Sequence, residues 1–529
     1  MGFDRATSMA ALQAGETFDV VIIGGGATGL GTAVDAASRG YRVALIEGED
    51  FAKGTSSRST KLVHGGVRYL RQGNVALVLE ALRERGRLAR NAPHLVRDRA
   101  FVIPNYHWWE GPFYGIGMKV YDQLAGRLGL AKSRGLSKAE TQELIPNVEM
   151  EGLDGGVVYH DGQFDDARLA IHLALTAAEH GAVMANYCRG VGLRKTGDGV
   201  TGVEVRDQET GVTFTVGAKV VVNATGIFVD ELRAQDQPDT KPIVAVSQGI
   251  HLVLPRRFLP GNAALMVPKT SDGRVLFAVP WHDCVVVGTT DTAVEAPSLE
   301  PRALPEERAF VMDHAKRYLH DDPTEADVLS VFAGLRPLVK GDGSTSTAAL
   351  SRDHAIMVSP SGLITVTGGK WTTYRKMAED VVTQIEIVGG FDERPCRTVD
   401  LRLHGSGEEW ERTKDTIDAY GSDRAKVESL VSTVKDGAAL LHPRLPYQVG
   451  EVIWQVRHEM ARSVEDVLAR RMRVLLLDAQ AAIEMAPKVA AVMAVEMGKD
   501  QVWRDEQVTT FTANARGYVY TDPASVGGG

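Results

Sequence analysis

Hydrophobic and polar positions near the start of the chain alternate between the patterns of a strand and a helix. The apolar run FDVVIIGGG is followed by an alanine-rich segment ending near Arg39, and then by a second apolar run, YRVALIE. Short apolar runs bounded by glycine favour buried strands, and the alanine-rich segment between them favours a helix. The order predicts a strand–helix–strand unit with parallel strands.

Two later segments repeat this kind of strand. KVVVNATG (219–226) and GLITVTGGKWTTYRKMAED (362–380) each carry an apolar run that ends in glycine. Because they lie so far apart in the sequence, they predict one sheet assembled from separated pieces. We therefore expect a discontinuous Rossmann-like domain formed by residues 16–100, 180–240 and 340–392.

The intervening segments have a different pattern. Residues 243–295 are rich in β-branched residues, and the run RVLFAVPWHDCVVVGTTD is interrupted at PWHD as expected for a hairpin. We expect an inserted antiparallel-sheet domain formed by residues 101–179 and 241–339. From about residue 400, apolar residues recur at three- and four-residue spacing, which predicts a helical C-terminal domain over residues 393–525. The expected fold class is α/β plus α.

Composition narrows the classes of function. The 529 residues are 44% hydrophobic and 24% charged, which is typical of a globular chain of two or three domains. With 59 basic and 68 acidic residues, the net charge of -9 lacks the basic excess of nucleic-acid-binding proteins, so we expect no nucleic-acid partner. The three cysteines are far apart and the 14 histidines form no HxH or HExxH pattern, so no metal site is predicted. A reducing, cytoplasmic compartment is expected.

The sequence leaves open an attachment to the membrane surface and predicts no membrane-spanning helix. The first 15 residues lack the pattern of a secretory signal, and no run of about 18 uncharged apolar residues predicts a spanning helix. Residues 106–135 combine tryptophan, phenylalanine and tyrosine with lysine and arginine, as interfacial helices do. A helix packed on the second domain is the alternative interpretation of this segment.

A glycine pattern follows the first strand. VVIIGGGATGLG places Gly24, Gly26 and Gly29 in GxGxxG register. In this register the glycines allow a tight turn, the approach of backbone to a pyrophosphate, and close packing of helix on strand. Glu47 ends the next strand, where a carboxylate can bind the hydroxyls of an adenosine ribose and repel a 2'-phosphate. The pattern predicts a dinucleotide other than NADP, and by itself it does not separate FAD from NAD.

A hydroxyl-rich stretch, TSSRSTKLVHGGVRYL (55–70), follows soon after Glu47. FAD is longer than NAD and needs contacts along its pyrophosphate, ribityl chain and ring, which such a stretch can supply. Gly65 and Gly66 would let the backbone come close to the flavin ring. A solvated Ser/Thr loop is the alternative, but the position after the ribose-binding acid favours FAD. For His64 we expect a contact with the flavin and no covalent bond.

Taken together, the motifs resemble those of the FAD-dependent glycerol-3-phosphate dehydrogenase family of the aerobic, quinone-linked type. The matching stretches, in the family's order, are IIGGGATGLG, TSSRSTKLVHGGVRYL, NATG, GIHLVLPR, VVGTTD, AGLRPL, SRDHAI and GGKWTTYRKMAED. The similarity spans about residues 17–390, and the helical tail also resembles the family's C-terminal domain. The chain departs from the pattern at Ile227 and Phe228, where Pro-Trp is expected, and at Gln248, where lysine is frequent.

The resemblance implies oxidation of sn-glycerol 3-phosphate to dihydroxyacetone phosphate by hydride transfer to N5 of FAD, with the electrons passed to a membrane quinone. A soluble oxidase that uses oxygen and a non-enzymatic flavin-binding regulatory protein are the alternatives. We also expect a homodimer. The expected location is cytoplasmic, either free or peripheral on the inner face of the cell membrane. The expected cofactor contacts are Gly24, Gly26, Thr28, Gly29, Glu47, Thr55, Ser56, Ser57, Ser59, Lys61, His64, Gly65, Gly66, Ala224, Thr225, Gly226, Gly369, Lys370 and Thr372.

Binding of a phosphorylated substrate needs cations. The resemblance places Arg68, Tyr69, Arg352 and Lys370 at the substrate. A planar guanidinium suits a phosphate through paired hydrogen bonds, and a helix beginning near Thr372 would place positive charge beside a reduced flavin. Ordinary surface residues are the alternative interpretation of each of these cations.

Oxidation of the alcohol also needs a group that accepts the hydroxyl proton. His251 lies within a predicted strand, and a neutral imidazole can accept a proton near neutral pH. Arg336 lies at a strand end and could polarise the same oxygen. We expect both to be catalytic, with the division of work between them open; a core histidine and a structural ion pair are the alternatives.

Overall fold

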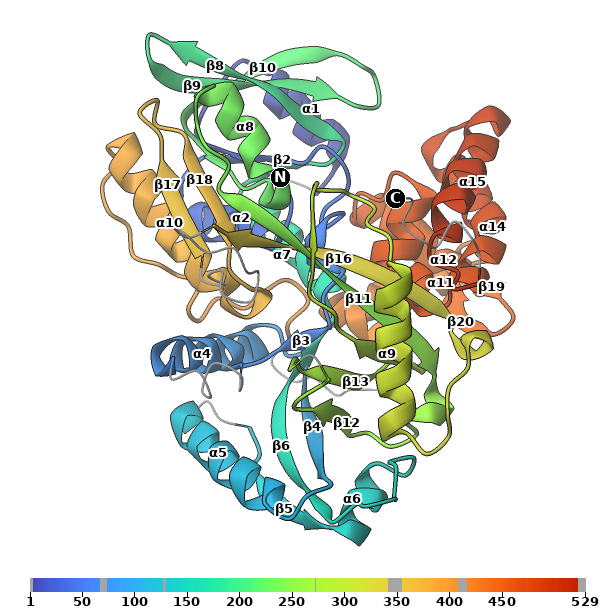
Figure 1. The fold of residues 1–529 in the computed structure, drawn as a ribbon. Helices are drawn as coiled ribbons and strands as arrows, with labels where there is room; N and C mark the ends of the chain where they lie inside the picture. Colours follow the sequence, from blue (N-terminus) through green and yellow to red (C-terminus); the bar gives the residue numbers. More distant parts are fainter. Residues whose placement is uncertain are drawn as a thin grey trace.

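The computed structural model describes residues 3–66, 74–126, 130–271, 273–340, 354–407 and 416–521. Figure 1 shows two sheets with their helices and a helical part near the C-terminus. The predicted fold class is confirmed. Within these ranges, no helix is long and apolar enough to cross a bilayer.

The first sheet contains eight strands within the described ranges. Its order is β17 (His354–Val358), β18 (Ile364–Gly368), β10 (Thr213–Asn223), β1 (Thr17–Ile23), β2 (Val43–Ile46) and β7 (Val183–Ala185), with β9 (Gly199–Asp207) and β8 (Cys188–Thr196) attached beside β10. The pairs from β18 to β7 are parallel, and β17, β9 and β8 pair antiparallel. The sheet is therefore assembled from separated segments, as the sequence predicts.

Both faces of this sheet are covered, which explains the continuous apolar run of β1. Val20 and Ile22 pack with the helices α2 (Ala27–Ser38), α7 (Asp166–Glu179) and α10 (Tyr374–Gly389) in one core. Val21 and Ile23 face a second core on the other side of the sheet, with residues of β9, α1 (Arg5–Gln13) and α8 (Val229–Asp236). A strand buried on both faces carries apolar residues at successive positions rather than at alternate positions.

The second sheet contains ten strands within the described ranges. Its order is β15 (Thr292–Val294), β11 (Val244–Pro255), β14 (Cys284–Gly288), β13 (Leu276–Trp281), β12 (Ala264–Val267), β4 (Val96–Asn105), β6 (Gly155–Phe164) and β3 (Leu62–Val63), with β16 (Ser330–Val339) paired to β11 and β5 (Arg134–Ser137) paired to β6. The interruption at PWHD is the turn of the β13–β14 hairpin. The helices that accompany this sheet are α4 (Val75–Asn91), α5 (Glu110–Ala125), α6 (Lys138–Leu144) and α9 (Pro305–Tyr318).

This sheet differs from the prediction in two respects. Its pairing is antiparallel except between β4 and β12, where Phe101 and Val102 pair in parallel with Ala264 and Leu265. In addition, β3 and half of β4 lie before residue 101, whereas α7 packs on the first sheet although it lies within 101–179. The chain therefore crosses between the sheets more often than the predicted boundaries allow.

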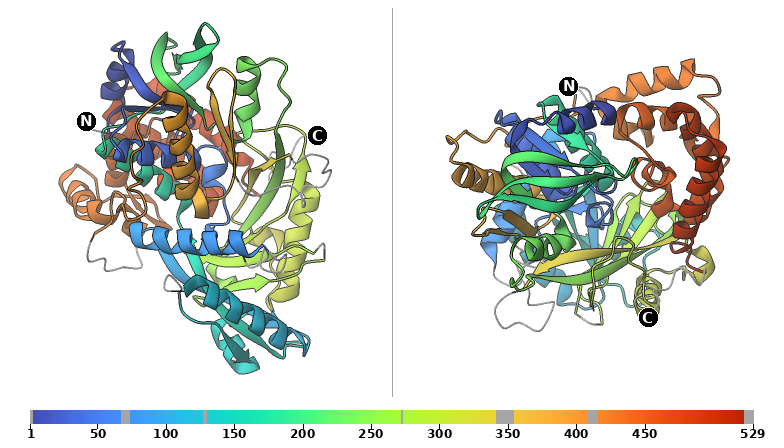
Figure 2. Two further views of the ribbon diagram at one scale, coloured as in Figure 1. Left: turned by 90° about the vertical axis from the view of Figure 1, so that its left-hand side faces the viewer. Right: turned by 90° about the horizontal axis from the view of Figure 1, so that it is seen from above.

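The C-terminal part is mainly helical, as predicted. It contains α11 (Arg424–Thr433), α12 (Val449–His458), a π-helix (Asp466–Arg471), α13 (Val474–Leu477), α14 (Ala479–Met497), α15 (Gln501–Arg516) and the hairpin of β19 (Leu440–His442) and β20 (Leu445–Gln448). Its apolar core continues into the second sheet through Val253, Trp281 and Phe332. Figures 1 and 2 show these helices on one side of the molecule. The C-terminal part is thus built onto the second sheet through a shared core.

Candidate active site

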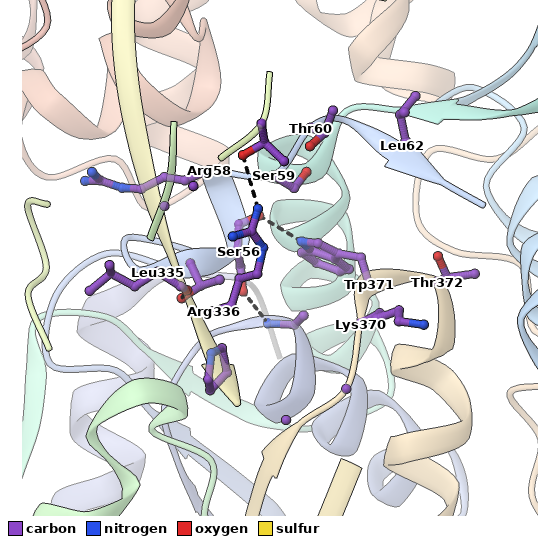
Figure 3. Close-up of a pocket in the computed structure, with 18 of the residues that line it drawn as sticks. Ser56, Arg58, Ser59, Thr60, Leu62, Leu335, Arg336, Lys370, Trp371 and Thr372 are labelled. Atoms are coloured by element: carbon purple, nitrogen blue, oxygen red, sulfur yellow. Dashed lines mark hydrogen bonds between the residues drawn. The ribbon is translucent and has the colours of Figure 1, made fainter. Parts of the chain in front are cut away.

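A cavity of about 380 Å³ lies between the two sheets. From the first sheet it is lined by the segments that follow β1, β10 and β18, and from the second sheet by β11, β16 and the end of β14. Ligands in open parallel sheets bind beyond the carboxyl ends of the strands, so the location is the one expected for a bound dinucleotide. Figure 3 shows how side chains from the two sheets meet there.

The turn between β1 and α2 depends on its glycines. Gly24 has φ +113°, and a Cβ there would lie 2.5 Å from the carbonyl oxygen of Ala224. A Cβ on Gly29 would lie 1.9 Å from the carbonyl oxygen of Gly24. Both contacts are far below van der Waals distance, so this close approach requires glycine. The N-terminus of α2 is thereby brought to the cavity wall, a geometry suited to a pyrophosphate.

Glu47 lies directly after β2, beside this turn. Its Oε2 accepts a hydrogen bond from the N–H of Gly25 (2.6 Å), and its Oε1 accepts one from the N–H of Glu49 (2.8 Å). Burial raises the pKa of Glu47, and these two bonds oppose that effect. Each carboxylate oxygen has a second lone pair, so a fixed acceptor is available for ribose hydroxyls.

The hydroxyl-rich loop is attached to both sheets. Thr55 in the 3-10 helix η1 (Thr55–Ser57) donates from its hydroxyl to the carbonyl of Leu335 in β16 (2.6 Å). The indole N–H of Trp371, in η6 (Trp371–Thr373), donates to the carbonyl of Ser56 (2.9 Å; Figure 3). The hydroxyl of Ser56 in turn accepts from the N–H of Ala27 at the start of α2 (2.9 Å).

Most of the predicted cofactor contacts line the cavity. Those that line it are Gly26, Thr28, Thr55, Ser56, Ser59, His64, Gly66, Ala224, Gly226, Gly369, Lys370 and Thr372. Those that do not line it are Gly24, Gly29, Glu47, Ser57, Lys61, Gly65 and Thr225. Within the second group, Gly24, Gly29 and Glu47 shape or flank the turn, and Gly65 donates its N–H to the hydroxyl of Tyr121 (2.8 Å).

The structure corrects the prediction for Lys61. Its side chain is fully buried, and Nζ lies 2.7 Å from each carboxylate oxygen of Asp166. Ser57 is also buried, and its carbonyl accepts a bond from the same Nζ (2.6 Å). The ammonium of Lys61 therefore binds a carboxylate of α7 behind the cavity wall, because Asp166 offers it a partner that the local sequence does not reveal.

His251 lies on β11 at the cavity wall and is 2% exposed. Its Nε2 lies 2.9 Å from the hydroxyl oxygen of Thr60, and its ring stacks on Phe332 with centroids 4.8 Å apart. Burial lowers the pKa of His251 well below its usual value, and the positive charges of Arg336 and Lys61 lower it further. The imidazole is therefore neutral near pH 7, the form that can accept a proton.

Arg336 lies on β16, on the strand that pairs with the strand of His251. Its Nη2 donates to the hydroxyl of Thr289 (3.1 Å), and its Nη1 lies 3.7 Å from Oδ1 of Asp291. A Cβ on Gly249 would lie 2.3 Å from Nη2 of Arg336, and one on Gly288 would lie 2.4 Å from Cδ2 of His251. These two glycines make room for the functional side chains, a role that their sequence context does not reveal.

Lys370 follows β18 and also lines the cavity. Gly368 and Gly369, directly before it, have φ values of +80° and +74°, a left-handed conformation that favours glycine. The turn leads through η6 into α10, so the N-terminal end of that helix faces the cavity region. Positive charge from Lys370 and the helix end is thus available to an anionic group.

Three predicted substrate-binding residues, Arg68, Tyr69 and Arg352, lie outside the described residues. The predicted convergence can be examined for His251, Arg336 and Lys370, and all three line the same cavity. Among the residues of the described ranges, no group of three His, Cys, Asp or Glu is arranged to hold a metal ion.

One part of the cavity, the apolar arm, is lined by apolar side chains, and the sequence did not predict it. Its lining side chains are Leu62, Phe101, Tyr159, Met266, Val275 and Phe277. These residues belong to an apolar cluster that continues to Met118 and Tyr114 of α5. The signal was present as apolar positions in predicted strands, but nothing local shows that they face a cavity rather than a closed core.

Two known protein families match the chain. One, described as FAD dependent oxidoreductase, matches residues 19–375. The other, described as the C-terminal domain of alpha-glycerophosphate oxidase, matches residues 364–506. Together they cover both sheets and most of the helical part.

Individual proteins are similar over most of the chain. Mitochondrial glycerol-3-phosphate dehydrogenase of Rattus norvegicus is 40% identical over 543 residues, covering 96% of this chain and 74% of the relative. The same enzyme of Homo sapiens is 39% identical over 551 residues, covering 98% and 75%. The X-ray structure of glycerol-3-phosphate dehydrogenase from Bacillus halodurans, complexed with FAD, is 30% identical with a TM-score of 0.80 and covers 97% of each chain.

Proposed function

The chain belongs to the FAD-dependent glycerol-3-phosphate dehydrogenase family, and from this membership we propose that it oxidises sn-glycerol 3-phosphate to dihydroxyacetone phosphate and passes the electrons to a membrane quinone. FAD is the cofactor of this oxidoreductase. The single observation that best supports the substrate is the cavity itself, where the glycine turn of a dinucleotide site meets His251, Arg336 and Lys370.

The cavity fits FAD on its own geometry. The close backbone approach at Gly24 and Gly29 brings the start of α2 to the cavity, which Gly26 and Thr28 line. Glu47 lies at the position of a ribose acceptor, and the loop from Thr55 to Thr60 lies along the path beyond it. These residues would hold the adenosine, pyrophosphate and ribityl parts, and FAD when bound supplies the acceptor of the hydride.

The chain's own residues supply the remaining chemistry. As the C–H hydride of the secondary alcohol leaves, the neutral imidazole of His251 accepts the hydroxyl proton and the carbonyl of the product forms. Arg336, held by Thr289 and Asp291, stabilises the developing charge on that oxygen. Lys370 supports the phosphate or the reduced flavin with its positive charge.

Anaerobic addition of sn-glycerol 3-phosphate to the purified holoenzyme tests this proposal. The oxidised flavin absorbance should bleach, with one dihydroxyacetone phosphate formed per flavin. A protein that keeps its yellow colour under these conditions would instead fit a non-enzymatic flavin-binding role, and the proposal would be wrong. Adding oxygen or a soluble quinone to the reduced enzyme then separates an oxidase from a quinone-linked dehydrogenase.

Two features support quinone as the acceptor. The apolar arm of the cavity is continuous with residues of α5. On the outside, large apolar side chains at and just before α5 are exposed: Trp108 by 83%, Ile116 by 67% and Phe113 by 52%. An exposed aromatic and aliphatic surface on one helix is typical of a protein that rests on a lipid interface.

The proposed location is therefore peripheral, on the cytoplasmic face of the cell membrane with α5 towards the lipid. Figure 1 shows α5 at the end of the molecule away from the C-terminal helices. A homodimer is part of the proposal, and sedimentation of the detergent-free protein tests it, because a monomer at micromolar concentration would exclude a stable dimer.

A further inference from the structure

A buried ion pair lies behind the cavity wall, next to the proposed base. The side chains of Lys61 and Asp166 are both 0% exposed. Nζ of Lys61 has three acceptors: Oδ1 and Oδ2 of Asp166 at 2.7 Å and the carbonyl of Ser57 at 2.6 Å. Burial lowers the pKa of Lys61, and the carboxylate of Asp166 opposes that effect; the three acceptors match the three hydrogens of an ammonium.

The pair closes a short turn. Lys61 has φ +65°, an unusual conformation for a residue with a side chain, and the bond from Nζ to Ser57 spans the turn. Asp166 also accepts bonds from the N–H (3.0 Å) and the hydroxyl (2.7 Å) of Ser59. The residues on both sides of Thr60 are therefore bound to one carboxylate at the start of α7.

Thr60 connects this turn to His251. Its hydroxyl oxygen lies 2.9 Å from Nε2 of His251, and both residues line the cavity. Nδ1 of His251 is buried and has no hydrogen-bond partner within the described ranges. Thr60 thus makes the hydrogen bond that, together with the stacking on Phe332, holds the ring in its orientation.

The charge of Lys61 also acts on the imidazole. Its Nζ lies 5.6 Å from the ring centroid of Phe332, the ring on which His251 stacks. The other charged groups facing His251 are Arg336 on β16, which is near Asp291, and Asp166, which is paired with Lys61. On the β14 side the register partner of His251 is Gly288, which carries no charge. Arg336 and Lys61 thus oppose protonation of this histidine, and the carboxylate of Asp166 offsets part of the effect of Lys61.

We propose that Lys61 is a positioning residue, which together with Asp166 fixes Thr60 against His251 and keeps the imidazole in its neutral, proton-accepting form. This inference rests on the proposed role of His251 as the base. It goes beyond that role by assigning a function to a residue that makes no contact with the cavity.

The test is the pH dependence of flavin reduction by sn-glycerol 3-phosphate, measured anaerobically by stopped flow on FAD-loaded enzyme. Lys61→Met combined with Asp166→Asn removes both charges and retains the volume. We expect the acidic limb of the rate profile to move up by about half a pH unit, a loss of about threefold in rate on that limb, because the loss of the Asp166 carboxylate offsets part of the loss of the Lys61 ammonium. Substrate affinity should change little. A uniform fall in rate with an unmoved limb would overturn the inference.

Two further variants keep the test decisive. Thr60→Val leaves the ion pair intact and removes only the hydroxyl beside His251, so it should also move the limb even if the double variant does not fold; an unmoved limb would contradict the positioning role. The matched control is Arg168→Met with Glu459→Gln, a pair equally buried (1% and 3% exposed) that should leave the limb in place. If the control pair shifts the acidic limb as far as the Lys61 and Asp166 double variant does, the inference would also be overturned.

Failure of the base proposal gives a different result. If His251→Ala keeps the wild-type rate and limb, His251 is not the base and the role of Lys61 falls with it. If His251→Ala abolishes the limb while the Lys61 and Thr60 variants leave it unmoved, only the positioning role is wrong.

Discussion

The buried guanidinium of Arg58 and the half-buried carboxylate of Glu300 form an ion pair, with Nη2 2.8 Å from Oε1. Arg58 belongs to the hydroxyl-rich loop at the cavity, and Glu300 also pairs with Lys53 (2.9 Å). Lys53 in turn contacts Glu465 of the C-terminal part (2.5 Å). The loop that lines the cavity is therefore attached to the C-terminal domain through charged groups, which indicates a role for that domain in holding the site.

Breaking this network should destabilise the protein and loosen FAD. Glu300→Gln leaves Arg58 buried without this counter-charge. Removing one partner of a fully buried pair costs about 3–5 kcal/mol, and the cost here should be smaller because Glu300 is half-buried. We expect a lower denaturation midpoint in urea and faster FAD release. Glu16→Gln, which removes the partner of Arg42 in a pair exposed by 54% and 67%, is the control and should change little. Equal effects of the two substitutions would contradict the importance of the buried network.

Replacement of His251 should affect chemistry more than binding. His251→Ala removes the proton acceptor, so flavin reduction by substrate should slow by roughly 10²–10⁴-fold with a modest change in substrate dissociation constant. Single-turnover reduction at several substrate concentrations separates the two quantities. A variant whose affinity falls while its limiting rate stays constant would make His251 a binding residue.

The carboxylate of Glu47 should determine the affinity for FAD. Glu47→Ala removes the acceptor at the end of β2 and leaves the N–H groups of Gly25 and Glu49 without their partner. Loss of one charge-assisted hydrogen bond from a ribose hydroxyl to this carboxylate costs about 1.5–3 kcal/mol, so FAD should dissociate at least tenfold more readily. Titration of the apoprotein with FAD, followed by flavin fluorescence, measures this; an unchanged dissociation constant would exclude the ribose-binding role.

His404 should make stability depend on alkaline pH. Its Nδ1 lies 2.6 Å from Glu179 of α7 and its Nε2 lies 2.6 Å from Asp423. Burial lowers the pKa of His404, but the two carboxylates outweigh that effect and raise its pKa to about 9. The stabilisation is complete below the unfolded-state pKa of about 6.5 and is lost as pH rises through about 9, amounting to at most roughly 3 kcal/mol.

His404→Gln should therefore lower the melting temperature at pH 6 and have little effect at pH 10. Thermal unfolding of wild type and variant across this range is the measurement. His320→Gln serves as the control, because His320 is 68% exposed and its Nδ1 is 4.0 Å from Glu149. A constant difference between variant and wild type at every pH would show that His404 acts through packing alone.

The exposed surface at α5 should bind lipid. Trp108→Ser with Ile116→Ser removes two large apolar side chains, each worth about 1.5–3 kcal/mol when buried, so vesicle binding should weaken by at least tenfold. Co-sedimentation with phospholipid vesicles measures it. Val495→Ser with Val502→Ser is the matched control, since these valines of α14 and α15 are 81% and 63% exposed on the C-terminal helices. Equal losses in both variants would contradict a specific membrane face.

The sequence by itself determined the elements whose signals are local. The turn at Gly24 and Gly29 was predictable because close backbone approach requires glycine, and the β13–β14 hairpin because PWHD interrupts an apolar run. The sequence also predicted that distant segments form one sheet, because apolar runs of the same type recur in them, as expected for strands that are buried on both faces. His251 could be placed on a strand because an apolar run surrounds it, and Lys370 could be placed in a turn because two glycines precede it.

Only the tertiary structure decided which side chains became partners. Lys61 looks the same in the sequence whether it faces a phosphate or a carboxylate, and its partner Asp166 lies 105 residues away. The parallel pairing of β4 with β12, the apolar arm of the cavity and the shared core of the C-terminal domain have the same cause. Burial and charge pairing depend on which surfaces meet after folding, and local periodicity carries no information about that.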